Sequence, residues 1–146
     1  MASVAKAMRV GDPLDDKTEM GPVISANQRE RTESYIALGR KEGARYVCGG
    51  ERPAGDGYYL RPAIFADAKP GMRIVDEEIF GPMVVVIPFD TEAEAIAIAN
   101  DSIYGLSGSL WTNDLKRGLR VARAIQTGVL SVNSSSSVHL QGPFGG

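Results

Sequence analysis

Apolar residues along the chain follow helical spacing in some segments and form short continuous runs in others. The helical segments are expected at residues 2–9, 26–42, 90–102 and 113–128, with a further short helix or turn at 70–78. The short apolar runs predict strands within residues 44–50, 61–67, 83–89, 104–112 and 129–133. Helices and strands of these lengths indicate a chain that contains both element types throughout.

The second half of the chain, from residue 83 onward, reads as strand, helix, strand, helix and strand. Such alternation favours right-handed crossovers between parallel strands. The run MVVVIPF is continuously apolar and β-branched, which is typical of a strand covered on both faces. Trp111 falls within an expected strand, and we interpret it as a core residue. The sequence therefore predicts an α/β fold, a mostly parallel sheet with flanking helices.

Polar residues mark where three of the expected helices begin. The candidate N-caps are Ser25, then Asp90 or Thr91, and then Asn113 or Asp114. Gly43 follows the helix that Ser25 begins, and it suits the left-handed stop that ends many helices. The element boundaries are thus indicated independently of the apolar pattern.

Composition excludes several classes of partner. With 146 residues, the chain suits one domain or one large piece of a domain, and it can bury a core without disulfides or metal. The formal net charge of -2 gives no basic excess for nucleic acid or an anionic membrane surface. The sequence contains no run of about 18 apolar residues, so it predicts no membrane span. The single cysteine, Cys48, fits a reducing compartment, so we expect a cytoplasmic protein.

The hexapeptide EEIFGP, residues 77–82, is the strongest candidate for chemistry. Glu77 and Glu78 are adjacent, so they cannot both face one point on a helix. A carboxylate beside a strand end can accept hydrogen bonds from the vicinal hydroxyls of a nucleotide ribose. Phe80 would lie on the same side as Glu78 in an extended backbone, where its ring could cover a flat heterocycle. The alternative is a charged loop followed by a core phenylalanine.

Other reactive side chains give weaker signals. Cys48 lies in a short apolar strand, and we interpret it as a buried, inert cysteine. His139 is the only histidine, and the chain has no second ligand group at metal-binding spacing. We interpret it as a loop residue, with contact to a substrate as the less favoured alternative. The run Ser134 to Ser137 lacks the Gly-x-Ser-x-Gly context of a nucleophilic serine.

Several segments, taken in order, resemble the NAD(P)-dependent aldehyde dehydrogenase superfamily. They are GDPLDDKTEMGPVIS, GYYLRPAIFAD, EEIFGPMVVVIPFDTEAEAIAIANDSIYGLSGSLWTNDL, GVLSVN and PFGG. The resemblance covers essentially the whole chain. It implies a longer enzyme with a Rossmann-like cofactor domain, a catalytic domain and an oligomerisation hairpin. In that family a cysteine attacks the aldehyde, hydride passes to the nicotinamide, and a glutamate activates the hydrolytic water.

The resemblance also implies roles for four residues of this chain. By likeness, Glu78 binds the hydroxyls of the nicotinamide ribose, and Phe80 packs near the nicotinamide. Asn133 and Phe144 are expected to line the substrate pocket for the aldehyde. The implied cofactor of the complete enzyme is NAD or NADP.

The departures from the family pattern define what the 146 residues would contain. The family's nucleophile has a Gly-Gln-x-Cys context, whereas Cys48 stands in RYVCGG and is not that nucleophile. The general-base glutamate, the cofactor-binding lysine, the oxyanion asparagine and the dinucleotide-binding strands have no counterpart. We therefore expect residues 1–146 to be a partial catalytic domain, following the segment of the nucleophilic cysteine and ending at the PFGG loop.

Three functional hypotheses follow for the isolated chain. The first is an inactive part of an aldehyde dehydrogenase that binds the cofactor weakly or not at all. The alternatives are a non-catalytic interaction module derived from such an enzyme and one half of a split enzyme. Faces that pack on the rest of the family's catalytic domain would stay apolar and exposed, so we also expect a homo-oligomer.

Overall fold

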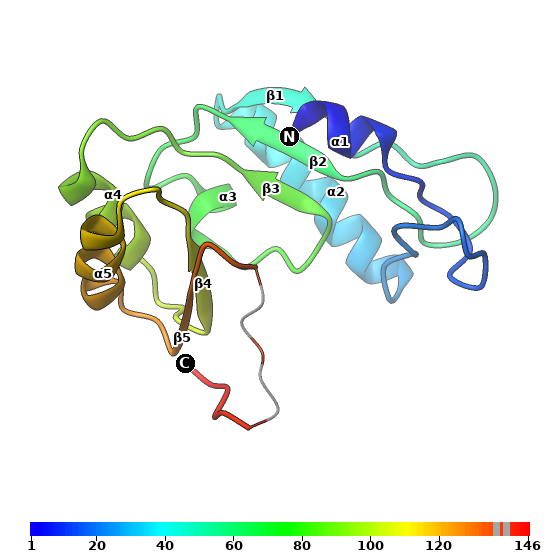
Figure 1. Ribbon diagram of the computed structural model, residues 1–146. Coiled ribbons are helices and arrows are strands. Elements are labelled where there is room, and N and C mark those ends of the chain that lie inside the picture. Colours follow the sequence, from blue (N-terminus) through cyan, green and yellow to red (C-terminus); the bar gives the residue numbers. More distant parts are fainter. Residues whose placement is uncertain (136–137, 139–140) are drawn as a thin grey trace. The chain divides into compact units, whose positions relative to one another are not determined.

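The computed structural model describes residues 1–135, 138 and 141–146 (Figure 1). The helices are α1 (Ala2–Ala7), α2 (Ala26–Lys41), α3 (Arg73–Asp76), α4 (Glu92–Asn100) and α5 (Leu115–Ala124). The strands are β1 (Arg45–Cys48), β2 (Ala63–Ala66), β3 (Met83–Val85), β4 (Ser107–Leu110) and β5 (Val129–Val132). Residue contacts divide the chain into two compact units, Met1–Pro88 and Phe89–Gly146. The assignment of all 146 residues to part of one catalytic domain stays a prediction.

The first unit contains a mixed sheet with the strand order β1-β2-β3. β1 runs antiparallel to β2, and β2 runs parallel to β3 with Ala63 opposite Met83. The connections explain the difference, because a parallel neighbour needs a crossover of a dozen or more residues. The segment between β2 and β3 supplies that crossover and includes α3. The segment between β1 and β2 carries no helix, and it returns the chain in the opposite direction.

The second unit contains a parallel pair, β4 and β5, joined through α5. This strand, helix and strand agree with the alternation expected from the sequence. The α/β class is therefore confirmed, with one mixed sheet and one parallel pair among the described residues. Strand β1 departs from the expected parallel order, because it pairs antiparallel with β2. The alternation of strands and helices in the second half of the chain gave no sign of this pairing.

Helix α2 begins at the predicted residue and ends one residue before the predicted end. The hydroxyl of Ser25 accepts a hydrogen bond from the backbone N–H of Gln28 at 3.2 Å, which satisfies one of the free donors of the first turn. Gly43 follows the last turn with a φ of 86°, a left-handed conformation that favours glycine. In the second unit the two open alternatives are resolved, since Thr91 caps α4 and Asp114 caps α5.

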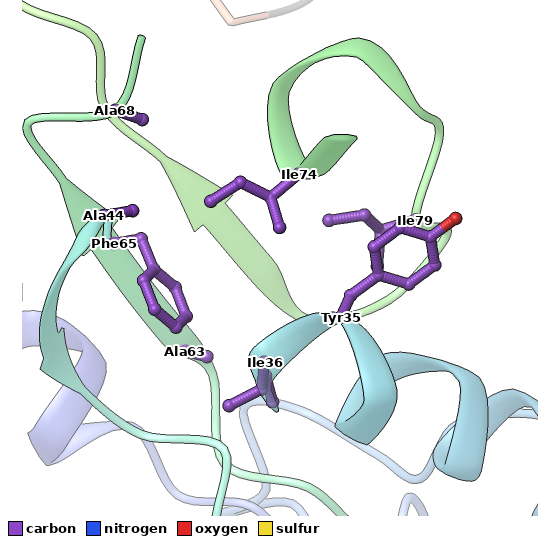
Figure 2. Packing of buried hydrophobic residues seen from close by; sticks show 8 residues of the cluster. All are labelled: Tyr35, Ile36, Ala44, Ala63, Phe65, Ala68, Ile74 and Ile79. Carbon is purple, nitrogen blue, oxygen red and sulfur yellow. The ribbon is translucent and has the colours of Figure 1, made fainter. Parts of the chain in front are cut away.

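The core of the first unit lies between the sheet and helices α2 and α3. Figure 2 shows the side chains of Ile36, Phe65 and Ile74 converging from these three elements. The whole cluster is Tyr35, Ile36, Ala44, Ala63, Phe65, Ala68, Ile74 and Ile79. All four residues of β2 are buried, as expected for the central strand of a sheet. This core holds one face of α2 close to the segment that follows α3.

Two predictions about burial are wrong. Trp111 lies just beyond β4 and is 65% exposed, so it is not a core residue. The short strand β3 exposes Val84 and is not covered on both faces. In α5 the buried positions are Gly118 and Val121, and Leu115 is 73% exposed. Periodicity identified the amphipathic helix correctly, but it does not report which part of its apolar stripe is covered.

Among the described residues, no helix is long and apolar enough to cross a membrane.

Candidate functional site

The EEIFGP segment forms a loop, residues 77–82, between α3 and β3. At its start the backbone N–H of Glu77 donates to the carbonyl of Arg73 at 3.0 Å, and the chain then becomes extended. At its end the carbonyl of Pro82 accepts from the N–H of Ala63 on β2 at 2.8 Å. Both ends of the loop are therefore attached to regular elements.

Two side chains of α2 bind three consecutive carbonyls of this loop. The side-chain amide of Gln28 donates to the carbonyls of Ile79, at 3.1 Å, and Phe80, at 2.7 Å. The guanidinium of Arg31 donates to the carbonyl of Glu78 at 2.9 Å. Backbone carbonyls need partners, and here α2 supplies them where the loop has no sheet neighbour. The backbone of the loop is thus fixed against the helix.

Gly81 lets the loop approach α2 closely. A Cβ at this position would lie 2.2 Å from the Oγ1 atom of Thr32, well inside van der Waals contact. Thr32 is fully buried, and its hydroxyl donates to the carbonyl of Gln28 at 2.9 Å. The threonine cannot move aside without breaking that bond, so the sequence needs glycine here for space.

This attachment leaves the side chains of Glu78 and Phe80 exposed, while Ile79 between them is buried in the core. An open groove of about 470 Å³ runs beside them, lined by Ile74, Glu77, Glu78, Ile79, Phe80, Gly81, Met83 and Val85. Glu78 and Phe80 therefore border the same groove, and their binding of a cofactor stays a prediction. The alternative of a core phenylalanine is excluded, because Phe80 is 79% exposed.

The backbone of Phe80 has a φ of 57° and is not extended as expected. The left-handed region costs a residue with a Cβ about 1–2 kcal/mol. A large aromatic that is both strained and exposed contributes little to stability.

Phe80→Gly and Phe80→Ala test this strain directly. Both variants remove the exposed ring, but only glycine adopts the left-handed conformation without steric cost. We expect the glycine variant to have a free energy of unfolding about 1 kcal/mol higher than the alanine variant. Urea unfolding of the two proteins measures the difference. An alanine variant as stable as the glycine variant would contradict the left-handed backbone.

Glu77 has a different role from its neighbour. Its carboxylate accepts hydrogen bonds from the guanidinium of Arg73, at 2.6 Å, and from the hydroxyl of Tyr35. These two donors, Arg73 first, lower the pKa of Glu77 from 4.5 to about 2. The bond to Glu77 in turn raises the pKa of Tyr35. The sequence analysis assigned no role to Glu77, and the structure shows that it is bonded to α2 and α3.

The lowered pKa of Glu77 predicts a pH effect on stability. A carboxyl group whose pKa is lower in the folded state stabilises the protein above its unfolded pKa and loses this contribution as pH falls through the folded value. The contribution of Glu77 is thus complete above pH 4.5 and is lost as the pH falls to about 2. Glu77→Gln should flatten the fall in unfolding free energy across this window, and Tyr35→Phe should flatten it in part. Urea midpoints that vary with pH equally in wild type and Glu77→Gln would contradict the assignment.

The other two predicted site residues, Asn133 and Phe144, belong to the second unit. The side-chain amide of Asn133 donates to the carbonyl of Thr112 at 2.9 Å, and its oxygen accepts from the N–H of Thr112 at 2.8 Å. Asn133, which directly follows β5, is thereby bound to Thr112, two residues beyond the end of β4. Phe144 is partly exposed in the C-terminal segment. That both residues line a substrate pocket stays a prediction.

The remaining candidates contribute no site within the described residues. Cys48 is buried in β1, as predicted, and it is a free cysteine. No group of three or more His, Cys, Asp or Glu side chains that could hold a metal ion occurs in the part of the chain that the structure describes. His139 lies outside the described residues.

Sequence reasoning missed the α2 side chains that hold the loop. They are Gln28, Arg31, Thr32 and Tyr35, which occupy positions i, i+3, i+4 and i+7 of one helix face. That spacing is visible in the sequence, and the polar members of the stripe were a usable signal. Nothing in α2 itself indicated which segment the stripe would contact, because the loop lies about 50 residues further along the chain.

The comparisons with known proteins identify the family of the chain. A sequence model described as the aldehyde dehydrogenase family matches residues 1–146. The chain belongs to the aldehyde dehydrogenase family. It is 46% identical over 144 residues to betaine aldehyde dehydrogenase 1 of Rhizobium meliloti, a match that covers 97% of this chain and 30% of that protein. The chain thus spans about 30% of the length of the curated relatives that it matches.

Solved aldehyde dehydrogenases share the fold. The enzyme of Mycobacterium tuberculosis, complexed with NAD⁺, is 48% identical, with a TM-score of 0.93 over 97% of this chain and 30% of that one. The betaine aldehyde dehydrogenase of Staphylococcus aureus, in complex with NAD⁺, is 40% identical, with a TM-score of 0.94 over 98% and 29%. The resemblance inferred from the motifs is thereby confirmed, and the matching structures include NAD⁺ complexes.

Proposed function

We propose that this chain is part of an NAD(P)-dependent aldehyde dehydrogenase, in which the 77–82 loop holds the nicotinamide end of the cofactor. The observation that carries the proposal is the exposed pair Glu78 and Phe80 beside one groove, on a loop whose carbonyls are bound to α2. In the complete enzyme an aldehyde is oxidised to a carboxylic acid, and the cofactor supplies the hydride acceptor.

The residues of the groove fit a nicotinamide nucleoside chemically. The carboxylate of Glu78 has two acceptor oxygens, which suit the two vicinal hydroxyls of a ribose. It binds no other side chain among the described residues, so it is available to a ligand. The ring of Phe80 offers an exposed apolar face to a flat heterocycle. Because the loop backbone is already bound, these side chains are presented without ordering of the loop on binding.

The 146 residues by themselves should show no dehydrogenase activity. Cys48, the only cysteine, is buried in a strand and is not in the family's nucleophile context. Removal of a catalytic nucleophile costs several orders of magnitude in rate. Incubation of the chain with NAD and acetaldehyde, benzaldehyde or betaine aldehyde measures this as NADH formation. Robust turnover by the chain alone would contradict the proposal.

A completed enzyme provides the positive test. Here we define it as the Rhizobium meliloti relative in which the matching 30% is replaced by this chain. The proposal predicts NADH formation by the completed enzyme, and an inactive product would count against it. The split-enzyme alternative is tested by mixing this chain, as a separate protein, with the relative from which the matching part has been removed. Activity in neither the completed enzyme nor this mixture would favour an interaction module.

We also propose that the chain associates with itself. Large apolar side chains remain exposed within the second unit, including Ile103, Trp111 and Leu115. Exposed apolar surface favours association. Sedimentation at tens of micromolar, a range where such association is common, should show dimers or larger species, and a clean monomer would contradict the proposal.

A further inference from the structure

We propose that Tyr35 and Glu77 are positioning residues that preorganise the 77–82 loop for the cofactor. The inference rests on the proposed function, since the loop would hold the nicotinamide end. Neither residue needs to touch the cofactor: Tyr35 lies in the core, and Glu77 is turned toward Tyr35 and Arg73.

Tyr35 is the rigid member of this arrangement. It is buried among the core residues of the first unit, where it lies next to Ile79 (Figure 2). Its hydroxyl donates to the carboxylate of Glu77 and accepts from the guanidinium of Arg31 at 3.3 Å. The same guanidinium lies 5.0 Å from the centre of the Tyr35 ring, within the range of a cation–π contact. One phenol therefore fixes two charged side chains.

Both of those side chains in turn fix the loop. Glu77 is the residue at which the chain leaves α3, so anchoring its carboxylate sets the direction of the loop. Arg31 donates to the carbonyl of Glu78 at 2.9 Å. A long exposed arginine would otherwise lose considerable side-chain entropy to hold that carbonyl, and the contact with Tyr35 restricts it in advance. The path of contacts runs from the core, through Tyr35, to the first two residues of the loop.

Glu77 also receives the guanidinium of Arg73 one helical turn earlier, at 2.6 and 3.1 Å. As a partly exposed ion pair, this contact alone would contribute little to stability. Its geometric effect is larger, because it fixes the side chain of Glu77 from α3 while Tyr35 fixes it from α2. Ordering a backbone residue costs roughly 1–2 kcal/mol, so a loop ordered in the free protein avoids that cost when the cofactor binds.

Backbone ¹⁵N relaxation of the 146-residue chain tests the proposal without any cofactor. We expect order parameters near 0.85, typical of rigid backbone, for residues 78–81 in the wild type. In Glu77→Gln and in Tyr35→Phe these values should fall below about 0.6, while those of α2 and β2 stay unchanged. The effects of the two substitutions should be less than additive in the double variant, because both weaken the contact between Tyr35 and Glu77. Loop order unchanged in Glu77→Gln would overturn the proposal, and this variant keeps an intact core even if Tyr35→Phe fails to fold.

Two controls separate local positioning from general effects. Glu92→Gln removes a comparable glutamate bonded to Arg120 in the second unit, and it should leave the order of the loop unchanged. Glu78→Gln should also leave the loop ordered, although it removes the proposed ligand of the ribose. If the completed enzyme carrying Glu78→Gln binds NAD normally, the cofactor proposal is wrong. Failure of the positioning proposal would appear as rigid loops in the Tyr35 and Glu77 variants.

Discussion

Phe65→Ala is expected to lower the free energy of unfolding by about 3–5 kcal/mol, the range for a fully buried phenylalanine. Phe65 is completely inaccessible on the central strand β2. Its ring packs edge-to-face on Tyr46, at 5.7 Å between centroids. Helix α2 also approaches it closely, since a Cβ at Gly39 would lie 3.0 Å from the ring. Alanine at this position would leave a cavity. The cavity cannot close easily, because Tyr46 on β1, strand β2 itself and helix α2 surround it.

Urea unfolding measures this loss, which is a large part of the 5–15 kcal/mol that typical domains possess. The matched control is Phe144→Ala, where the ring is partly exposed in the second unit. That control should change the stability by no more than about 0.5 kcal/mol. Equal effects of the two substitutions would contradict the position of the core.

Glu78→Gln in the completed enzyme is expected to raise the KM for NAD by about 10- to 100-fold. The substitution keeps the shape of the side chain but removes the charge that strengthens hydrogen bonds from the ribose hydroxyls. Hydrogen bonds to charged groups contribute about 1.5–3 kcal/mol, and each 1.4 kcal/mol is a factor of ten in affinity. The free energy of unfolding should stay within about 0.5 kcal/mol, because the side chain is exposed.

Steady-state kinetics with varied NAD measures this effect. The matched control is Glu30→Gln, which changes another exposed glutamate of the first unit, on α2. It should leave the KM for NAD unchanged. An unchanged KM in Glu78→Gln, or an equal rise in both variants, would remove Glu78 from the cofactor site.

Local signals in the sequence predicted the elements well. The N-cap Ser25, the stop Gly43 and the helical spacing between them defined α2, because each acts within a few residues of the chain. The antiparallel pairing of β1 and the exposure of Trp111 were not predicted, since they depend on which segments meet in space. The shortness of β3 has the same origin, because an apolar run becomes a strand only where a neighbour pairs with it.

In the candidate site, too, local features were predicted from the sequence and features that depend on distant contacts were not. The composition of EEIFGP and its family resemblance indicated Glu78 and Phe80, and the structure leaves both side chains exposed beside one groove. The role of Glu77 could not be predicted, because its partner Tyr35 lies 42 residues earlier in the chain. The left-handed backbone of Phe80, in a loop whose carbonyls are bound by α2, was also not predicted.

A structure of the completed enzyme with NAD bound tests the central claim most directly. The measured quantity is the distance from the carboxylate oxygens of Glu78 to the hydroxyls of the nicotinamide ribose. We predict hydrogen-bond distances of about 2.5–3.0 Å, with the ring of Phe80 beside the nicotinamide and the loop backbone still bound to α2. A ribose held elsewhere, with Glu78 left in solvent, would contradict the account.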